Sequence, residues 1–185
     1  HDPPAPSVAD TAVAASTAIP ASARTALWPQ LRQGGLLLFM RHANAPGVGD
    51  PEAFRIDDCS TQRNLSDHGR RQATAVGARL RHNGVAWASV ESSRWCRCLE
   101  TARLAFGAAE PLPLLDSSFA GRPDATPELR RHLLALPRTE ANRIYVTHMV
   151  NVMRLLGINA SDAEIVAARI DRDALQTIGT LRPEI

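Results

Sequence analysis

The stretch Leu36-Leu37-Leu38-Phe39-Met40-Arg41-His42 is an apolar run that ends in a guanidinium group and an imidazole. Gly34-Gly35 precede the run and Ala43-Asn44-Ala45-Pro46-Gly47 follow it, so the pattern predicts a buried strand that opens into a loop. In open α/β sheets, ligands bind just beyond the carboxyl ends of the strands. Arg41 and His42 are therefore expected to lie at a ligand site.

Two later segments repeat this arrangement of a strand followed by chemically active residues. Arg143-Ile144-Tyr145-Val146-Thr147-His148 predicts a strand that delivers a second histidine, with a helix from Val150 to Leu156 after it. Ser92-Ser93 joins a strand predicted at 85–92 to a helix predicted at 95–106, where helix amides and a first-turn arginine can converge on an anion. Together these strand ends suit an anionic substrate attacked by a nitrogen nucleophile.

Strands and helices alternate along the rest of the chain. The further predictions are a helix capped by Ser66 and ended by Asn83-Gly84, a strand at Pro111–Leu115, a helix capped by Thr126 that runs to about Leu136, a short helix capped by Ser161, and a last strand at Ala174–Leu181. This alternation predicts an α/β fold: a single-domain three-layer α/β/α sandwich with a mostly parallel central sheet.

Composition sets the class of protein. The 185 residues are 44% hydrophobic and 22% charged, with a net charge of +2, which gives no reason to expect a nucleic acid as partner. No apolar run approaches the roughly twenty residues that a membrane span needs. All 21 basic residues are arginine, so only its position can mark a particular arginine as functional. Residues 1–27 form an Ala/Pro-rich segment expected to be flexible, and 28–185 the folded domain. The oligomeric state is not indicated.

The three cysteines are Cys59, Cys96 and Cys98. Cys59 bridged to Cys96 or to Cys98 would suit an exported protein, and three buried free thiols are the alternative. The spacing does not match a zinc site, so no metal is expected. The Ala/Pro-rich start and this possible disulfide favour a periplasmic or secreted protein, with a cytoplasmic location as the alternative.

Four motifs, in order along the chain, resemble those of the histidine phosphatase superfamily, to which the phosphoglycerate mutases belong. Arg41-His42-Ala43 is similar to its Arg-His-Gly signature, and Leu65 to Ala73 matches Leu-[Ser/Thr]-x-x-Gly-x-x-Gln-Ala. Ser92 to Ala102 matches Ser-Ser-x-x-x-Arg-x-x-x-Thr-Ala, and Val146-Thr147-His148 matches the segment with the second histidine. The resemblance implies a phosphoglycerate mutase-like fold and a metal-independent phosphatase without a cofactor, acting on a small phosphomonoester or phosphoramidate.

The resemblance also implies roles for individual residues. His42 would be the nucleophile that forms a covalent phosphohistidine, while Arg41, Arg97 and His148 hold the phosphoryl oxygens. Asp116 corresponds to the proton donor of mutase-like relatives, and Asp124 is the second choice.

Other positions near the motifs bear on substrate binding. Asn44 and Arg94 are further candidates for contact with substrate, Arg94 standing where the family usually has proline. Ala43 replaces the usual glycine, although alanine disfavours positive φ, and Met149 is expected to narrow the pocket. Two alternatives remain open: an inactive relative that binds phosphorylated or anionic ligands, and a phosphoglycerate-type mutase.

Overall fold

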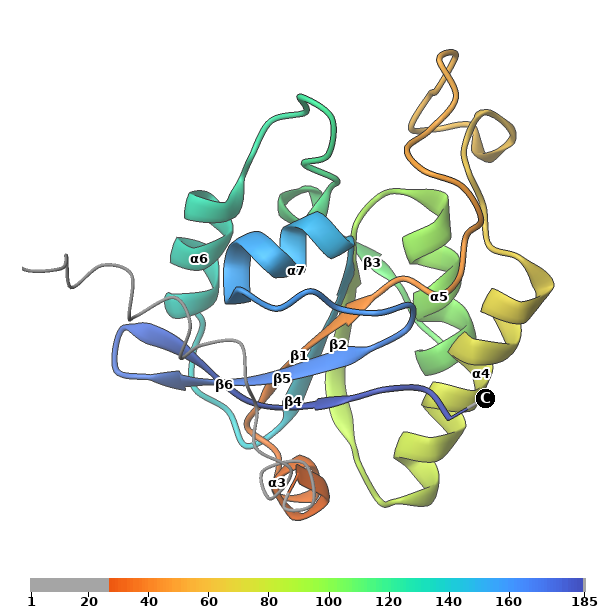
Figure 1. Ribbon diagram of the computed structural model, residues 1–185. Helices are drawn as coiled ribbons and strands as arrows, with labels where there is room; N and C mark the ends of the chain where they lie inside the picture. Colours follow the sequence, from red (N-terminus) through yellow and green to blue (C-terminus); the bar gives the residue numbers. More distant parts are fainter. Residues whose placement is uncertain (1–26, 185) are drawn as a thin grey trace, which may run out of the picture.

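The structure, a computed structural model, describes residues 27–184 and contains one six-stranded sheet in the order β3-β2-β4-β1-β5-β6 (Figure 1). β1, β4, β2 and β3 are parallel, whereas β5 runs antiparallel to both β1 and β6. The strands are β1 (Leu37–Arg41), β2 (Trp87–Ser92), β3 (Glu110–Pro111), β4 (Asn142–Thr147), β5 (Ile165–Asp171) and β6 (Ala174–Leu181). Of the segment 1–27 expected to be flexible, residues 1–26 lie outside the described chain.

Helices cover both faces of this sheet, which confirms the predicted three-layer α/β/α class. One face carries α3 (Leu27–Gln33), α4 (Asp67–His82) and α5 (Cys96–Phe106), and the other carries α6 (Thr126–Leu134) and α7 (Met149–Leu156). Within β1, Leu38 and Met40 join the first core, while Leu37 and Phe39 join the second. Burial on both faces explains why this strand is apolar throughout rather than alternating.

A close approach between two helices fixes the first of these layers. Gly77 of α4 lies so near α5 that a Cβ atom there would overlap the carbonyl oxygen of Ala105. Gly69, in the first turn of α4, lies equally near the carbonyl oxygen of Asn44. The glycine of the second motif therefore lets the loop after β1 pack directly onto α4, and Ser66 caps the helix as predicted by accepting a hydrogen bond from the Gly69 N–H.

Three predictions about elements were wrong. The strand predicted at Pro111–Leu115 is shorter, because Pro113–Leu115 forms a 3-10 helix, η2. Ser161 is followed by a turn rather than a helix; its N–H donates to the Glu164 carboxylate, and β5 begins at Ile165 and pairs with β1. Thr126 is the first residue of α6 rather than its cap, since its hydroxyl donates to Asp124, and α6 ends at Leu134. No described helix combines the length and apolar character needed to cross a membrane.

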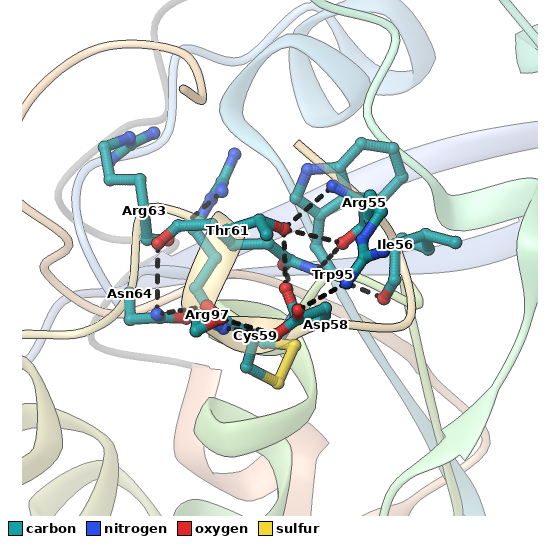
Figure 2. Close-up of a disulfide and its surroundings, with 12 residues drawn as sticks. Arg55, Ile56, Asp58, Cys59, Thr61, Arg63, Asn64, Trp95 and Arg97 are labelled. Atoms are coloured by element: carbon teal, nitrogen blue, oxygen red, sulfur yellow. Dashed lines mark hydrogen bonds and ion pairs between the residues drawn. A yellow bond between two sulfur atoms is a disulfide. The ribbon is translucent and has the colours of Figure 1, made fainter. Parts of the chain in front are cut away.

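A disulfide joins Cys59 to Cys96 (Figure 2). Cys98 is a buried free thiol. Cys59 opens the 3-10 helix η1 (Cys59–Thr61) in the long loop after β1, and Cys96 is the first residue of α5. The bridge therefore ties residues 44–64, called here the long loop, to the start of α5. One of the pairings left open by the sequence is thereby confirmed.

The Cys59→Ser/Cys96→Ser variant should lose stability because its unfolded chain is no longer cross-linked. The closed loop spans 37 residues, for which the chain-entropy relation gives about 4 kcal/mol in the free energy of unfolding. Urea denaturation under non-reducing conditions measures the loss, and wild type treated with reductant serves as the matched control. Equal urea midpoints for the variant and the oxidised wild type would contradict the placement of the bridge.

Candidate active site

The carboxyl ends of β1 and β4 bring together the histidine of the first motif, His42, and that of the fourth, His148. The two strands are adjacent and parallel, with Arg41 in register with Thr147, so His42 and His148 follow at the same edge. Their ring centroids are 5.6 Å apart. A cavity of about 120 Å³ is lined there by Arg41, His42, Arg97 and His148, so the structure brings together the four residues that the motifs single out. Arg41 and His42 lie at the end of β1, His148 follows β4, and Arg97 is the second residue of α5, the helix that follows β2.

His42 is a buried, neutral imidazole with a fixed tautomer. Its Nδ1 lies 2.8 Å from the carbonyl oxygen of Ala43, and because a carbonyl only accepts, Nδ1 carries the proton and Nε2 keeps a lone pair. Burial lowers the pKa of His42 to about 3; the bond to Ala43 opposes this, and the charges of Arg97 and Arg41 add to it. The ring therefore stays unprotonated at neutral pH, as a nitrogen nucleophile requires.

His148 is also buried and neutral. Its Nε2 lies 2.8 Å from the Ser93 hydroxyl and 3.5 Å from the Cys98 sulfur. Burial, followed by the proximity of His42 and Arg97, holds its pKa well below the usual value. The second serine of the Ser-Ser pair in the third motif therefore has a structural role, because Ser93 orients His148. Burial also raises the pKa of Cys98 to about 12, so this thiol is an inert neighbour.

The two arginines predicted to hold phosphate are fixed by oxygen acceptors on one side. Arg97 donates to both carboxylate oxygens of Asp50, at 2.8 and 3.3 Å. Arg41 donates to the Ala160 carbonyl at 2.8 Å and lies 3.3 Å from the Asp162 carboxylate. In both side chains Nε is buried and has no hydrogen-bond partner among the described residues. Each guanidinium group therefore keeps a donor that no protein oxygen satisfies.

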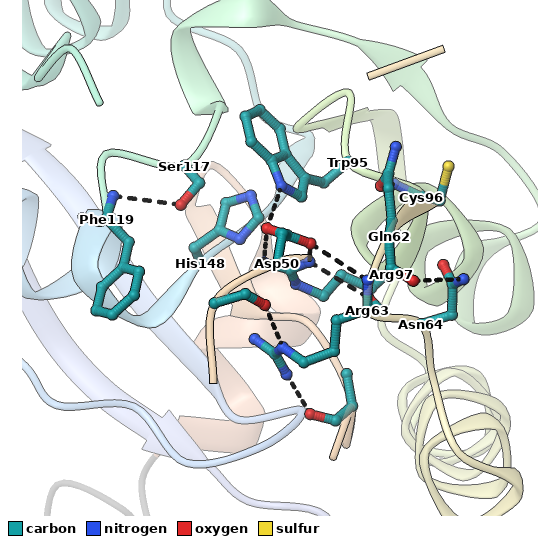
Figure 3. A network of polar contacts seen from close by, with 12 residues as sticks. Asp50, Gln62, Arg63, Asn64, Trp95, Cys96, Arg97, Ser117, Phe119 and His148 are labelled. Atoms are coloured by element: carbon teal, nitrogen blue, oxygen red, sulfur yellow. Dashed lines mark hydrogen bonds and ion pairs between the residues drawn. The ribbon is translucent and has the colours of Figure 1, made fainter. Parts of the chain in front are cut away.

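Arg63 is a third cavity-lining arginine that the sequence prediction missed. Its Nε donates to the Gly49 carbonyl at 2.7 Å, and its Nη1 donates to the Ala45 carbonyl (Figure 3). Burial and the nearby charge of Arg97 lower its pKa. Its place two residues before the second motif was the available signal. The cavity therefore gathers three cations and two neutral imidazoles, a set that attracts an anion.

Asp116, Arg94 and Asn44 do not line the cavity. The Asp116 carboxylate accepts hydrogen bonds from the Arg94 backbone N–H at 2.9 Å and from its guanidinium group at 2.8 and 2.5 Å. The Asn44 amide donates to Asp162 at 3.0 Å and accepts from the Ser66 hydroxyl at 2.6 Å, which holds the loop in place. The lining of the cavity contains no carboxylic acid.

The departures from the family pattern fit the site. Ala43 does not have a positive φ, so alanine is compatible with its backbone. Its N–H donates to the Thr101 hydroxyl at 3.1 Å, which links the first motif to the third. Met149 lines the cavity as expected. The mouth is completed by residues of the long loop and of the segment after η2, namely Gly47, Val48, Gly49, Ser117, Phe119 and, from α7, Val150.

Comparison with known proteins agrees with this fold. The model of the histidine phosphatase superfamily (branch 1) matches residues 37–118, which hold three of the four motifs. No curated protein sequence matches the chain.

Solved structures share the fold at low identity. The protein histidine phosphatase SixA complexed with tungstate has 18% identity, a TM-score of 0.60 and coverage of 80% of this chain and 97% of its own. Phosphoserine phosphatase from Entamoeba histolytica has 14% identity, a TM-score of 0.57 and coverage of 80% and 98%. A mycobacterial glucosyl-3-phosphoglycerate phosphatase in complex with VO3 has 14% identity, a TM-score of 0.57 and coverage of 78% and 97%. The chain therefore has the histidine phosphatase fold, and the resemblance to the histidine phosphatase superfamily that its motifs carry is confirmed.

Proposed function

We propose that the protein is a metal-independent phosphatase that hydrolyses a phosphomonoester or phosphoramidate through a covalent phosphohistidine on His42. One observation carries the proposal: a buried imidazole with a free Nε2 lone pair faces a cavity lined by three guanidinium groups. The tungstate and VO3 in the similar solved structures support an oxyanion in this place. The cavity of about 120 Å³ suits a phosphoryl group, with the rest of the substrate at the mouth.

In the first step, Nε2 of His42 attacks phosphorus and the bond to the leaving group breaks. The leaving oxygen or nitrogen takes the bonding electron pair, and a proton from water neutralises it. Arg41, Arg97 and Arg63 stabilise the charge on the non-bridging oxygens, and this effect is strong at Arg97 and His42 because both side chains are almost completely buried. His148 lines the same cavity without adding charge to it, since its low pKa keeps the ring neutral in the free protein.

In the second step, water attacks phosphorus, the P–N bond to His42 breaks, and inorganic phosphate leaves. The electron pair of that bond returns to Nε2, which restores the starting imidazole. The hydrogen bond from Nδ1 to the Ala43 carbonyl holds the ring in one tautomer throughout. No residue needs to change place between the two steps.

His42→Ala should abolish turnover without unfolding the chain. With para-nitrophenyl phosphate in the presence of EDTA, kcat/KM should fall at least about a thousandfold, because the nucleophile is lost. His68→Ala, on the exposed face of α4, is the matched control and should keep wild-type activity. Near-wild-type turnover by His42→Ala would remove this residue from the mechanism. If the folded wild type binds vanadate but hydrolyses no phosphoester, the protein is a binding protein rather than an enzyme. If turnover depends on a bisphosphoglycerate primer, the protein is a mutase.

The absence of a carboxylic acid from the cavity lining bears on the choice of substrate. A positioned general acid contributes about 10²- to 10⁴-fold by protonating a poor leaving group. Asp116, the expected donor, has its carboxylate engaged by Arg94. We therefore favour substrates whose leaving group departs with little protonation, such as phosphoramidates or aryl phosphates.

The leaving-group dependence should accordingly be steep. Alkyl phosphates should react about 10²- to 10⁴-fold more slowly than aryl phosphates, measured as kcat/KM at pH 7, because no acid assists the alkoxide. Asp116→Asn should leave aryl phosphate hydrolysis within about threefold of wild type. Similar rates for both classes would show that an acid operates, and a loss confined to alkyl phosphates in Asp116→Asn would identify Asp116 as that acid.

Buried neutral histidines also predict a pH dependence of stability. Because the pKa of His42 is about 3 in the folded protein and about 6.5 when unfolded, the unfolded chain binds more protons between these values. The free energy of unfolding should therefore fall as pH is lowered from 7 to 5. His42→Gln should flatten this slope relative to wild type, measured by urea denaturation at each pH. An unchanged slope in His42→Gln would contradict the burial of a neutral ring.

We also propose that the protein works in an oxidising compartment, periplasmic or extracellular. The support is the disulfide between Cys59 and Cys96 beside the site, because such bridges persist where thiols are not kept reduced.

A further inference from the structure

We propose that Asp50 is a positioning residue for phosphoryl transfer: it acts through Arg97, whose guanidinium group it holds in the orientation that faces the cavity. The inference rests on the proposed phosphatase function and extends it to the long loop. None of the four family motifs includes this aspartate, which lies between Gly49 and Pro51.

The carboxylate of Asp50 is held by four donors. Oδ1 accepts from Nη1 of Arg97 at 2.8 Å and from the Arg63 backbone N–H at 3.3 Å. Oδ2 accepts from Nε1 of Trp95 at 3.0 Å and from Nη2 of Arg97 at 3.3 Å (Figure 3). Burial raises the pKa of Asp50, but the bonds from Arg97 and Trp95 outweigh burial and hold the pKa below its usual value. Asp50 is therefore an ionised, fully engaged counterion.

Arg97 needs such a counterion because its side chain is only 4% exposed and cannot lose its charge. Two bonds from one carboxylate fix the plane of the guanidinium group as well as its position. Both Nη atoms are engaged on the Asp50 side, and Nη1 also donates to the Arg63 carbonyl at 3.3 Å. Nη2 uses only one of its two N–H groups in this way, and its second N–H is the donor left for a phosphoryl oxygen.

The long loop holds Asp50 in place by binding three consecutive residues at the start of α5. The indole N–H of Trp95 donates to Asp50, and its ring stacks on that of Phe54 with centroids 5.0 Å apart. Cys96 forms the disulfide, and its N–H donates to the Gln62 side chain at 2.9 Å. Gln62 thereby caps the helix, because the side chain of the N-cap residue, Trp95, makes no capping bond. Arg97 binds Asp50 itself.

A residue of the segment after η2, Arg122, also packs against the stacked rings of Phe54 and Trp95. The guanidinium carbon of Arg122 lies 4.5 Å from the Phe54 ring centroid and 4.9 Å from that of Trp95. Trp95 is thus confined between two segments and the Asp50 carboxylate. Asp50 is bonded both to Arg97 and to this confined ring, so rotation of Arg97 away from the cavity would break its two bonds to a carboxylate that is itself held in place. Asp50 does not line the cavity, so its role in catalysis is exerted through Arg97.

A double-mutant cycle tests the proposal. Asp50→Asn, Arg97→Gln and the double variant are compared in kcat and KM with para-nitrophenyl phosphate. Asp50→Asn should lose about 10- to 100-fold in kcat/KM, the scale of an ångström-sized misplacement. In the Arg97→Gln background the same change should cost less than about twofold, because the residue through which it acts is absent.

The matched control is Asp58→Asn, the same chemical change in the same loop. Asp58 binds Ser60 and Arg55 and makes no contact with Arg97, so kcat/KM should stay near wild type. A purely structural role for Asp50 would give an additive cycle, which would overturn the proposal. Higher kcat/KM in Asp50→Asn would overturn it too, because the carboxylate would then compete with the substrate for Arg97.

Orthovanadate affinity separates this proposal from the function on which it rests. If wild type hydrolyses no phosphoester but binds orthovanadate, the phosphatase function is wrong. The same four proteins are then compared in their dissociation constants for orthovanadate, where a non-additive cycle supports the role of Asp50 and an additive one overturns it. If wild type neither hydrolyses phosphoesters nor binds orthovanadate, both proposals are overturned.

Discussion

The burial of charge-bearing groups at the carboxyl edge of β1 and β4 is the constraint on which the site depends. His42, His148 and Arg97 are each less than 5% exposed. The imidazoles meet this constraint by giving up their protons, so one of them is a ready nucleophile. A guanidinium group cannot do the same, and Arg97 is stabilised instead by the carboxylate of Asp50. The neutral imidazoles leave the charge of the cavity to its arginines, which makes it an anion site. The need of Arg97 for a counterion explains why the long loop carries Asp50 to the start of α5.

The sequence predicted the centre of this site because the relevant signals are local. An apolar run ending in Arg41-His42 and another ending in His148 each indicate a buried strand, and parallel strands present their carboxyl ends at one edge. Arg97 followed from the motif alignment. Arg63 and Asp50 could not be found in this way, because the long loop has no period. Its path is fixed by a disulfide and by side-chain bonds between residues far apart in the chain.

Tertiary contacts explain most of the other differences. The segment after Ser161 is rich in alanine, which favours a helix, yet its pairing with β1 makes it β5. The α3 helix lies in a region whose composition gave no helical signal, and its burial comes from packing on the sheet through Leu27 and Leu31. Asp116 and Arg94 were each placed near substrate, but their opposite charges satisfy one another, which no single-residue pattern reveals.

The most direct test of the account is to trap the covalent intermediate. The enzyme is mixed with substrate, quenched in alkali within one turnover, digested, and mapped by mass spectrometry, since a phosphoramidate survives alkali better than acid. The account predicts one phosphoryl group, on the peptide that carries His42, and none on the peptide that carries His148. Phosphate on His148, or rapid turnover with no phosphohistidine at any quench time, would contradict it.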